Sequence, residues 1–240
     1  MPNKLTQIRI ILLHTFHPGN IGAAARAMKT MGLQELVLVN PDNFPHSEAT
    51  SRAAGAKDIL ENLVIVDSLE EAIADCNQVF ATSARQPHSF TRPSLSAEEV
   101  AEWINENQAE KIAIVFGGER DGMSRDEINL CQQILYIPGN EEYCVLNVSA
   151  AVQIVCYELF KRLAANENTT IIGSPVLASQ KDLNNFYAHL EDLLTERQYI
   201  RPEQKSDSMV KLRSFINRAQ PTSADIGLLR GMIKALSRQI

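Results

Sequence analysis

Short runs of apolar residues alternate with longer helix-forming segments over the first two-thirds of the chain. The runs are continuously apolar, which is typical of strands buried on both faces of a parallel sheet. Strands are predicted at residues 8–13, 35–39, 63–66, 78–82, 112–116 and 134–137. Helices separate them, so the pattern predicts an α/β fold with a mostly parallel sheet and helices on both faces.

Residue preferences predict where the helices lie. A Pro-Gly-Asn turn at 18–20 leads into an alanine-rich helix over 21–31, which Gly32 ends. Further helices are predicted at 97–107 and 147–163 and, beyond a linker at 166–178, at 179–196, 205–218 and 223–239. We therefore expect an α/β domain over 1–164, then a linker and a small helical C-terminal extension over 165–240.

Composition is that of an ordinary globular protein, with 45% hydrophobic and 22% charged residues. No apolar run approaches the ~18 residues of a membrane helix. The polar start does not resemble a signal peptide, so a cytoplasmic protein is expected. The four cysteines form no Cys-x-x-Cys pair and have no histidine cluster beside them, so we expect buried thiols and no metal site.

The chain has a formal net charge of −6, and its charged residues are distributed unevenly along the sequence. Residues 1–164 carry 13 Lys and Arg against 21 Asp and Glu, whereas residues 205–240 carry 7 against 2. Nucleic-acid-binding proteins usually have a basic surface. An acidic body with a basic end indicates that any polyanion is held partly by the C-terminal extension.

Three segments that follow predicted strands carry candidate chemistry, and ligands of parallel sheets sit beyond the carboxyl ends of the strands. The first segment is His-Pro-Gly-Asn-Ile-Gly-Ala-Ala-Ala-Arg at 17–26. A turn leading into a helix can hold an anion on free N–H groups, and small residues let a substrate approach closely. Arg26 can reach back over the loop. Alternatively, the small residues serve only helix–sheet packing and Arg26 is a surface residue.

The second segment, Phe-Gly-Gly-Glu-Arg-Asp-Gly at 116–122, runs from a strand into paired glycines. Glu119 can hold the loop by accepting backbone N–H bonds, or it can contact substrate; a plain strand-to-helix turn is the alternative. The third segment, at 137–151, crosses to Asn147, a good N-cap for the long helix. Ile137 and Leu146 are candidate apolar walls of an adenine pocket.

In this order and at these distances, the three segments resemble the SpoU branch of the SPOUT methyltransferases. The family pattern is Asn-x-Gly-Ala-x-x-Arg, then Phe-Gly-x-Glu-x-x-Gly, then Leu-Asn-Val-Ser-x-Ala, found here at 20–26, 116–122 and 146–151. The resemblance covers about residues 8–163. It implies a trefoil knot in the C-terminal half of the α/β domain and bound S-adenosylmethionine. It also implies an obligate homodimer in which both subunits build each active site.

The resemblance implies roles for individual residues as well. Arg26 is the implied catalytic arginine, with Asn20 and Glu119 in the same site, and Arg85 and Asn147 are candidate RNA contacts. The implied S-adenosylmethionine pocket consists of Thr82, Ser83, Ala84, Gly117, Ile137, Cys144, Val145 and Leu146. The family often has Ser where this chain has Val145, so a hydroxyl at that position is not essential here.

Within the family, Thr-Ser-Ala-Arg at 82–85 and the helical extension are similar to bacterial enzymes that act on nucleotide 32 of the tRNA anticodon loop. The expected function is 2′-O-methylation of cytidine or uridine there, with Arg26 as a fixed cation near the 2′-oxygen. A family enzyme acting on rRNA or on the wobble nucleotide is an alternative, and so is a non-catalytic RNA-binding homologue. The absence of a Gly-x-Gly-x-x-Gly segment disfavours a nucleotide-dependent oxidoreductase.

Overall fold

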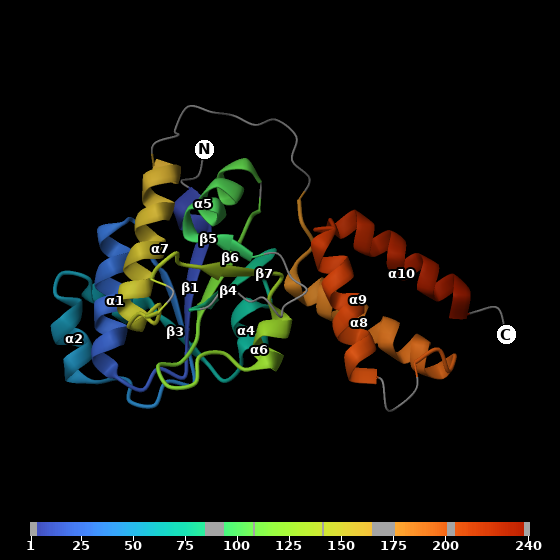
Figure 1. The fold of residues 1–240 in the computed structure, drawn as a ribbon, viewed down its shortest axis with the longest axis horizontal. Helices are drawn as coiled ribbons and strands as arrows, with labels where there is room; N and C mark the ends of the chain where they lie inside the picture. Colours follow the sequence, from blue (N-terminus) through green and yellow to red (C-terminus); the bar gives the residue numbers. More distant parts are fainter. Residues whose placement is uncertain are drawn as a thin grey trace.

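One parallel sheet organises the first two-thirds of the molecule. The computed structural model describes residues 4–84, 94–107, 109–140, 142–164, 176–200 and 205–237. In these residues the sheet has seven strands in the order β3-β2-β1-β6-β4-β7-β5, and every pairing is parallel (Figure 1). The strands are β1 Ile8–Leu13, β2 Glu35–Val39, β3 Val64–Val66, β4 Gln78–Ser83, β5 Ser94–Ser96, β6 Ile112–Phe116 and β7 Gln133–Tyr136. The predicted fold class is confirmed.

Helices cover both faces of the sheet. One face carries α1 Pro18–Thr30, α2 Ser47–Ala53, α3 Lys57–Asn62, α5 Ala97–Glu106 and α7 Val148–Leu163. The other face carries the shorter α4 Leu69–Ile73 and α6 Arg125–Leu130. A 3₁₀ turn at Lys4–Gln7 precedes β1.

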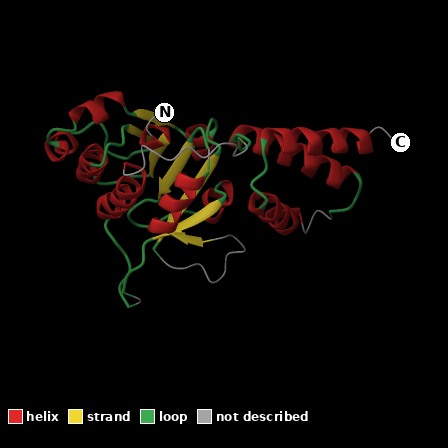
Figure 2. Ribbon diagram, turned by 90° about the horizontal axis from the view of Figure 1, so that it is seen from above, coloured by secondary structure: helices red, strands yellow, loops and turns green. Residues whose placement is uncertain are grey.

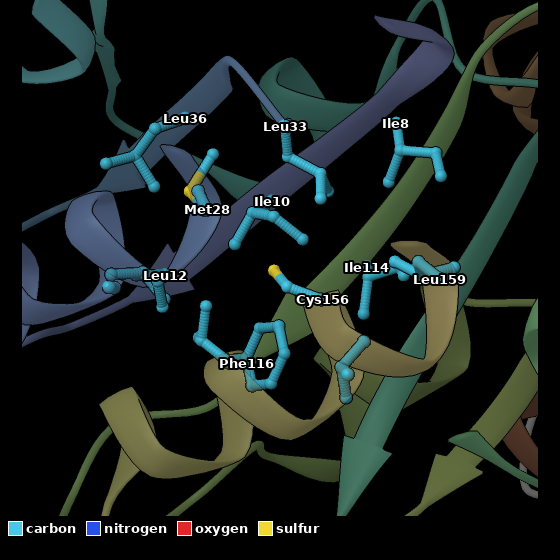
Figure 3. Packing of buried hydrophobic residues seen from close by; sticks show 14 of the residues in the cluster. Ile8, Ile10, Leu12, Met28, Leu33, Leu36, Ile114, Phe116, Cys156 and Leu159 are labelled. Carbon is cyan, nitrogen blue, oxygen red and sulfur yellow. The ribbon is translucent and has the colours of Figure 1, made fainter. Parts of the chain in front are cut away.

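Successive residues of β1 serve the two faces in turn. Ile10 and Leu12 belong to the apolar core under α1 and α7, whereas Ile11 and Leu13 belong to the core under α4 and α6. Figure 3 shows the first core, in which Cys156 of α7 lies among the strand side chains. Burial on both faces explains why the strands are continuously apolar in sequence.

The structure corrects the prediction of a turn at residues 18–20. Helix α1 begins at Pro18, because proline at the first helical position needs no N–H partner and has its φ angle already set. The glycines of this segment face α2. A Cβ at Gly22 would lie 2.0 Å from the carbonyl oxygen of Ala49, so this glycine lets α2 approach α1.

Two strands late in the chain are inserted between earlier ones. β6 lies between β1 and β4, and β7 lies between β4 and β5. This order brings the segments after β1, β4, β6 and β7 to one edge of the sheet. Residues 85–93, between β4 and β5, lie outside the described residues, and the implied trefoil knot stays a prediction.

The last three helices form a unit with its own core, hereafter the helical unit. It comprises α8 Gln180–Glu196, α9 Lys205–Arg218 and α10 Ser223–Ser237, close to the predicted helices (Figure 2). The predicted linker falls mostly on residues 165–175, outside the described residues. Tyr187 and Phe186 are among the largest buried side chains of the unit.

The helical unit is fastened to the sheet through the first turn of α8. The backbone N–H groups of Gln180 and Lys181 donate to the carbonyl oxygens of Cys76 and Ala74, at 2.6 and 3.1 Å. The free donors of one helix start thus satisfy the free acceptors at the end of α4. The buried side chain of Gln132 donates to that of Gln180, so the attachment lies at the amino ends of β4 and β7.

In the part of the chain that the structure describes, no helix is long and apolar enough to cross a membrane.

Candidate active site

A cavity of about 610 Å³ opens at the carboxyl edge of the sheet. All eight residues that were predicted for the cofactor pocket line it: Thr82, Ser83, Ala84, Gly117, Ile137, Cys144, Val145 and Leu146. They come from the end of β4 and from the segments after β4, β6 and β7. The strand order brings these segments together although they are up to 64 positions apart in sequence.

The cavity has apolar walls and a glycine-built turn. Leu135, Ile137 and Ala151 contribute apolar surface, while Val145 and Leu146 are 60% and 42% exposed at the mouth. Large apolar side chains held open to solvent beside a cavity indicate a surface that a ligand or another chain covers.

The turn after β6 requires glycine. Gly118 and Gly122 exchange two backbone hydrogen bonds, at 3.1 and 3.0 Å, which close the turn. A Cβ at Gly117 would lie 2.4 Å from the carbonyl carbon of Gly122. Gly122 has a φ of +68°, in the left-handed region that favours glycine. The paired glycines therefore shape the loop itself.

A chain of side-chain hydrogen bonds, hereafter the motif network, joins the three predicted motifs. Asn147 Nδ2 donates to Asn20 Oδ1 at 3.1 Å, and Asn20 Nδ2 donates to Glu119 Oε1 at 2.8 Å. Asn147 also caps α7 by accepting from the backbone N–H of Ser149 at 2.9 Å. Because one residue of each motif takes part, the network fixes the relative positions of the three loops.

Glu119 is the centre of this network. Its carboxylate also accepts the backbone N–H groups of Phe16 at 2.8 Å and His17 at 3.3 Å. Partial burial raises the pKa of Glu119, but the hydrogen bonds from Asn20, Phe16 and His17 outweigh that effect and leave the pKa lowered. Glu119 is therefore an ionised acceptor with its oxygens occupied, which suits holding the loop better than accepting a proton.

Arg26 lies apart from the cavity within one chain. It is exposed on α1, more than two turns after the helix start, and does not line the cavity. Within the described residues, no hydrogen bond or ion pair holds its guanidinium. Arg85, the other arginine predicted to contact RNA, lies outside the described residues.

Three of the four cysteines are buried, as predicted, and one is not. Cys76, Cys131 and Cys156 are buried, and burial raises the pKa of the Cys156 thiol to about 12. Cys144 is half-buried at the cavity. Among the described residues, no group of three or more His, Cys, Asp and Glu side chains could hold a metal ion.

Sequence reasoning missed two residues beside the cavity. The guanidinium of Arg120, which lines the cavity, lies 4.2 Å from the centre of the Phe16 ring. Phe16 follows β1 and remains 40% exposed. A large aromatic residue directly after a buried strand was the available signal, because that is the edge where a parallel sheet presents its ligands.

Two family models match the chain. The first, described as the SpoU rRNA Methylase family, matches residues 7–157. The second, described as the C-terminal domain of the tRNA methyltransferase TrmJ, matches residues 181–240. The first match contains the cavity and the second contains nearly all of the helical unit.

Individual proteins match over nearly the whole length. A Klebsiella pneumoniae protein named tRNA (cytidine/uridine-2′-O-)-methyltransferase TrmJ is 41% identical over 244 residues, covering 98% of both chains. The crystal structure of TrmJ from Z. mobilis ZM4 superposes with a TM-score of 0.84 at 32% identity, covering 96% of this chain and 99% of that one. The SpoU methyltransferase AviRb from Streptomyces viridochromogenes, solved in complex with AdoMet, shares the fold, with a TM-score of 0.53 at 17% identity over 65% and 60% of the two chains.

Proposed function

Because the chain belongs to the SpoU methylase family, we propose that it methylates the ribose 2′-hydroxyl of cytidine or uridine at position 32 of the tRNA anticodon loop. The enzyme class follows from full-length similarity to TrmJ proteins: the chain is an S-adenosylmethionine-dependent tRNA 2′-O-methyltransferase. The nucleotide is the part we propose. The observation that carries the reaction is the motif network, which holds all three family motifs around one cavity.

The cavity suits S-adenosylmethionine in its chemistry. Leu135, Ile137 and Leu146 offer apolar surface for an adenine ring, and Thr82 and Ser83, which carry hydroxyl groups, also line the cavity. Its volume lies in the usual range for small-molecule sites. When bound, S-adenosylmethionine supplies a methyl group on a positively charged sulfur.

The residues of the chain supply position and charge. A ribose hydroxyl is a weak nucleophile, so the protein must hold it close to the methyl group and stabilise the negative charge that develops on oxygen. Arg26 suits that second task as a fixed cation, and an arginine does not serve as a base because it stays protonated in proteins. Proton loss to water or to a phosphate of the RNA completes our proposal.

We propose that Arg26 acts in the cavity of a second subunit, since it does not reach its own. On α7, Tyr157 and Phe160 are 49% and 42% exposed on one side of the helix, and Val145 and Leu146 are exposed before its start. These side chains form an apolar surface next to α1, which packs against α7. Such a surface fits a homodimer in which each site is built by two chains.

A complementation experiment tests this arrangement. Arg26→Ala and a cavity variant, Gly117→Val, are each expected to be inactive alone. If Arg26 acts across the interface, co-expressed chains form mixed dimers with one complete site, and about a quarter of wild-type activity returns. If Arg26 acts within its own chain, the mixture stays inactive. Light scattering on the wild-type protein checks the dimer directly, and an active monomer would refute it.

The assignment to position 32 rests on similarity of the helical unit to the C-terminal domain of TrmJ. It implies that residues 1–164 carry the reaction, that residues 165–240 serve substrate choice, and that the protein works in the cytoplasm, where tRNA is. Mapping 2′-O-methyl groups in total RNA with and without the gene tests the assignment. Loss of the modification at the wobble nucleotide or in rRNA, and not at position 32, would replace it.

A further inference from the structure

Phe16 and Arg120 form a stacked pair at the rim of the cavity, hereafter the rim pair. The Arg120 guanidinium lies over the Phe16 ring at 4.2 Å from its centre, which is close for a cation–π contact. Both side chains are exposed, and Arg120 also lines the cavity. The pair therefore presents aromatic and cationic surface where the substrate must arrive.

The backbone under Phe16 is held on both sides. Its N–H donates to Glu119 Oε2 at 2.8 Å, and its carbonyl oxygen accepts from Asn43 Nδ2 at 3.2 Å. Glu119 and Arg120 are neighbours in sequence, so one residue fixes the backbone of Phe16 while the next one stacks on its ring. An exposed aromatic side chain on a fixed backbone loses little further freedom on binding.

We propose that the rim pair stacks against the base of the nucleotide whose ribose is methylated. This rests on the proposed function. Proteins that recognise loop nucleotides commonly stack the splayed base on an aromatic ring or on an arginine plane. Because Arg120 lines the cavity from which the methyl group comes, a ribose at the cavity mouth places its own base at the rim pair.

Stacking also fits the breadth of substrate in relatives. Every base has a π-face, so a stacking surface tolerates more than one base. The Klebsiella relative is named for both cytidine and uridine. The rim pair holds a pyrimidine of either kind without reading its hydrogen-bonding edge.

The test uses the full-length enzyme and two tRNA transcripts. One carries the natural nucleotide at the position that methyl mapping identifies, and the other carries an abasic ribose with its 2′-hydroxyl there. We expect Phe16→Ala to lower kcat/KM on the natural transcript by about 5- to 150-fold, the range of losses when a stacking aromatic is removed. Removing the base should lower wild-type kcat/KM similarly, and the two changes together should add little.

Substitutions at the same position separate stacking from packing. Phe16→Tyr should keep wild-type kcat/KM, whereas Phe16→Leu, which is apolar but not aromatic, should resemble Phe16→Ala. Tyr199→Ala is the control, because it removes a 77% exposed ring in the segment after α8. It should leave the ratio of kcat/KM between the natural and the abasic transcript unchanged. Affinity for S-adenosylmethionine should be unchanged in every Phe16 variant.

Several results would overturn the proposal. Independent, multiplying effects of Phe16→Ala and base removal would show that the ring does not contact that base. A change of oligomeric state in Phe16→Ala would show that the ring serves a subunit interface. Methylation at a nucleotide other than position 32 refutes only the earlier assignment, because the abasic site is placed wherever methylation is found. Absence of methylation on any RNA would refute both.

Discussion

Two polar networks occupy opposite ends of the same sheet, and they differ in whether arginine is paired with carboxylates. At the amino end, Arg9 of β1 is 8% exposed and pairs with Asp75 at 2.7 Å and Glu35 at 2.6 Å, while Lys111 reaches the same two carboxylates. At the carboxyl end, Arg120 lines the cavity, and Arg26 lies more than two turns along α1 from that edge. Both are exposed and, within the described residues, neither has a carboxylate partner.

The contrast separates charges that stabilise the fold from charges that remain available to a ligand. The amino-end network neutralises itself, since two cations face two carboxylates in a partly buried cluster. At the carboxyl end, the charge of Glu119 is stabilised by uncharged N–H donors of Phe16, His17 and Asn20 instead of by arginine. The two arginines are exposed, which fits our proposal that they meet phosphates or the charge that develops during the reaction.

The largest effect is expected at Arg26. Arg26→Ala should raise the barrier to methyl transfer by ~2–4 kcal/mol, the scale seen when one preorganised stabiliser is removed. Arg26→Lys should recover only part of the activity, because an ammonium group cannot reproduce the planar guanidinium. Single-turnover methylation of tRNA measures both. Lys29→Ala is the matched control, since Lys29 lies on the same helix but pairs with Asp58. Near-normal methylation by a stable Arg26→Ala protein would remove Arg26 from the mechanism.

The amino-end counterpart is Arg9→Met, which should affect stability instead. Removing Arg9 leaves Lys111 as the one remaining cation of the cluster against two carboxylates. We expect the free energy of unfolding to fall by about 2–3 kcal/mol, less than for a fully buried pair because Asp75 is half exposed. Turnover per folded molecule should not change. Chemical denaturation measures the loss. The control is Arg52→Met, which breaks an exposed pair with Glu48 and should lower the free energy of unfolding by only about 0.5 kcal/mol. Equal losses in the two variants would contradict the contrast.

Glu119→Gln should have an intermediate effect at the carboxyl end. The new amide donor would face the donors of Asn20, Phe16 and His17, so the loop should lose part of its order. We expect kcat/KM to fall by an amount equivalent to about 1–2 kcal/mol, with stability nearly unchanged. Glu70→Gln, on exposed α4 surface, is the control. A large loss of stability without loss of kcat/KM would assign Glu119 to the fold alone.

The smallest effect concerns pH. Burial raises the pKa of Asp75, but hydrogen bonds from Arg9 and Lys111 outweigh it and lower the pKa to about 2. A lowered pKa means that this stabilisation is complete above the unfolded-state pKa of about 4 and is lost as pH falls toward 2. Solvent screening limits it to about 1 kcal/mol. The difference in free energy of unfolding between wild type and Arg9→Met should be constant from pH 5 to 8 and become smaller below pH 4. A difference that grows below pH 4 would contradict stabilisation of ionised Asp75 by Arg9.

The sequence predicted the sheet better than its surroundings. Strands such as Ile8–Leu13 and Ile112–Phe116 are recognisable because burial on both faces makes them wholly apolar. The three-residue β5, Ser94–Ser96, and the short helices α2 and α6 were missed, because neither propensity nor periodicity is informative over three to seven residues. Their places depend on tertiary contacts, such as that between Gly22 and Ala49.

The sequence motifs predicted residues that the structure brings to one cavity, but they did not predict contacts between residues of different loops. Thr82, Gly117 and Leu146 line one cavity because Thr82 lies at the end of β4 and the other two follow strands that end at the same edge. The stacking of Arg120 on Phe16 joins residues 104 positions apart, and patterns within a short stretch of sequence do not predict such a contact. The isolation of Arg26 from its own cavity likewise becomes visible only in three dimensions.

The two edge strands, Val64–Val66 and Ser94–Ser96, are three residues long and are the shortest in the sheet. A long exposed edge invites another chain to add a strand, which leads to aggregation, and short edges are one way in which proteins prevent it. The long apolar strands β1, β2 and β6 all have neighbours on both sides. Short edges leave little unpaired backbone for another chain to extend, so we expect this protein to assemble with other chains through side chains on helices and loops, where recognition is specific.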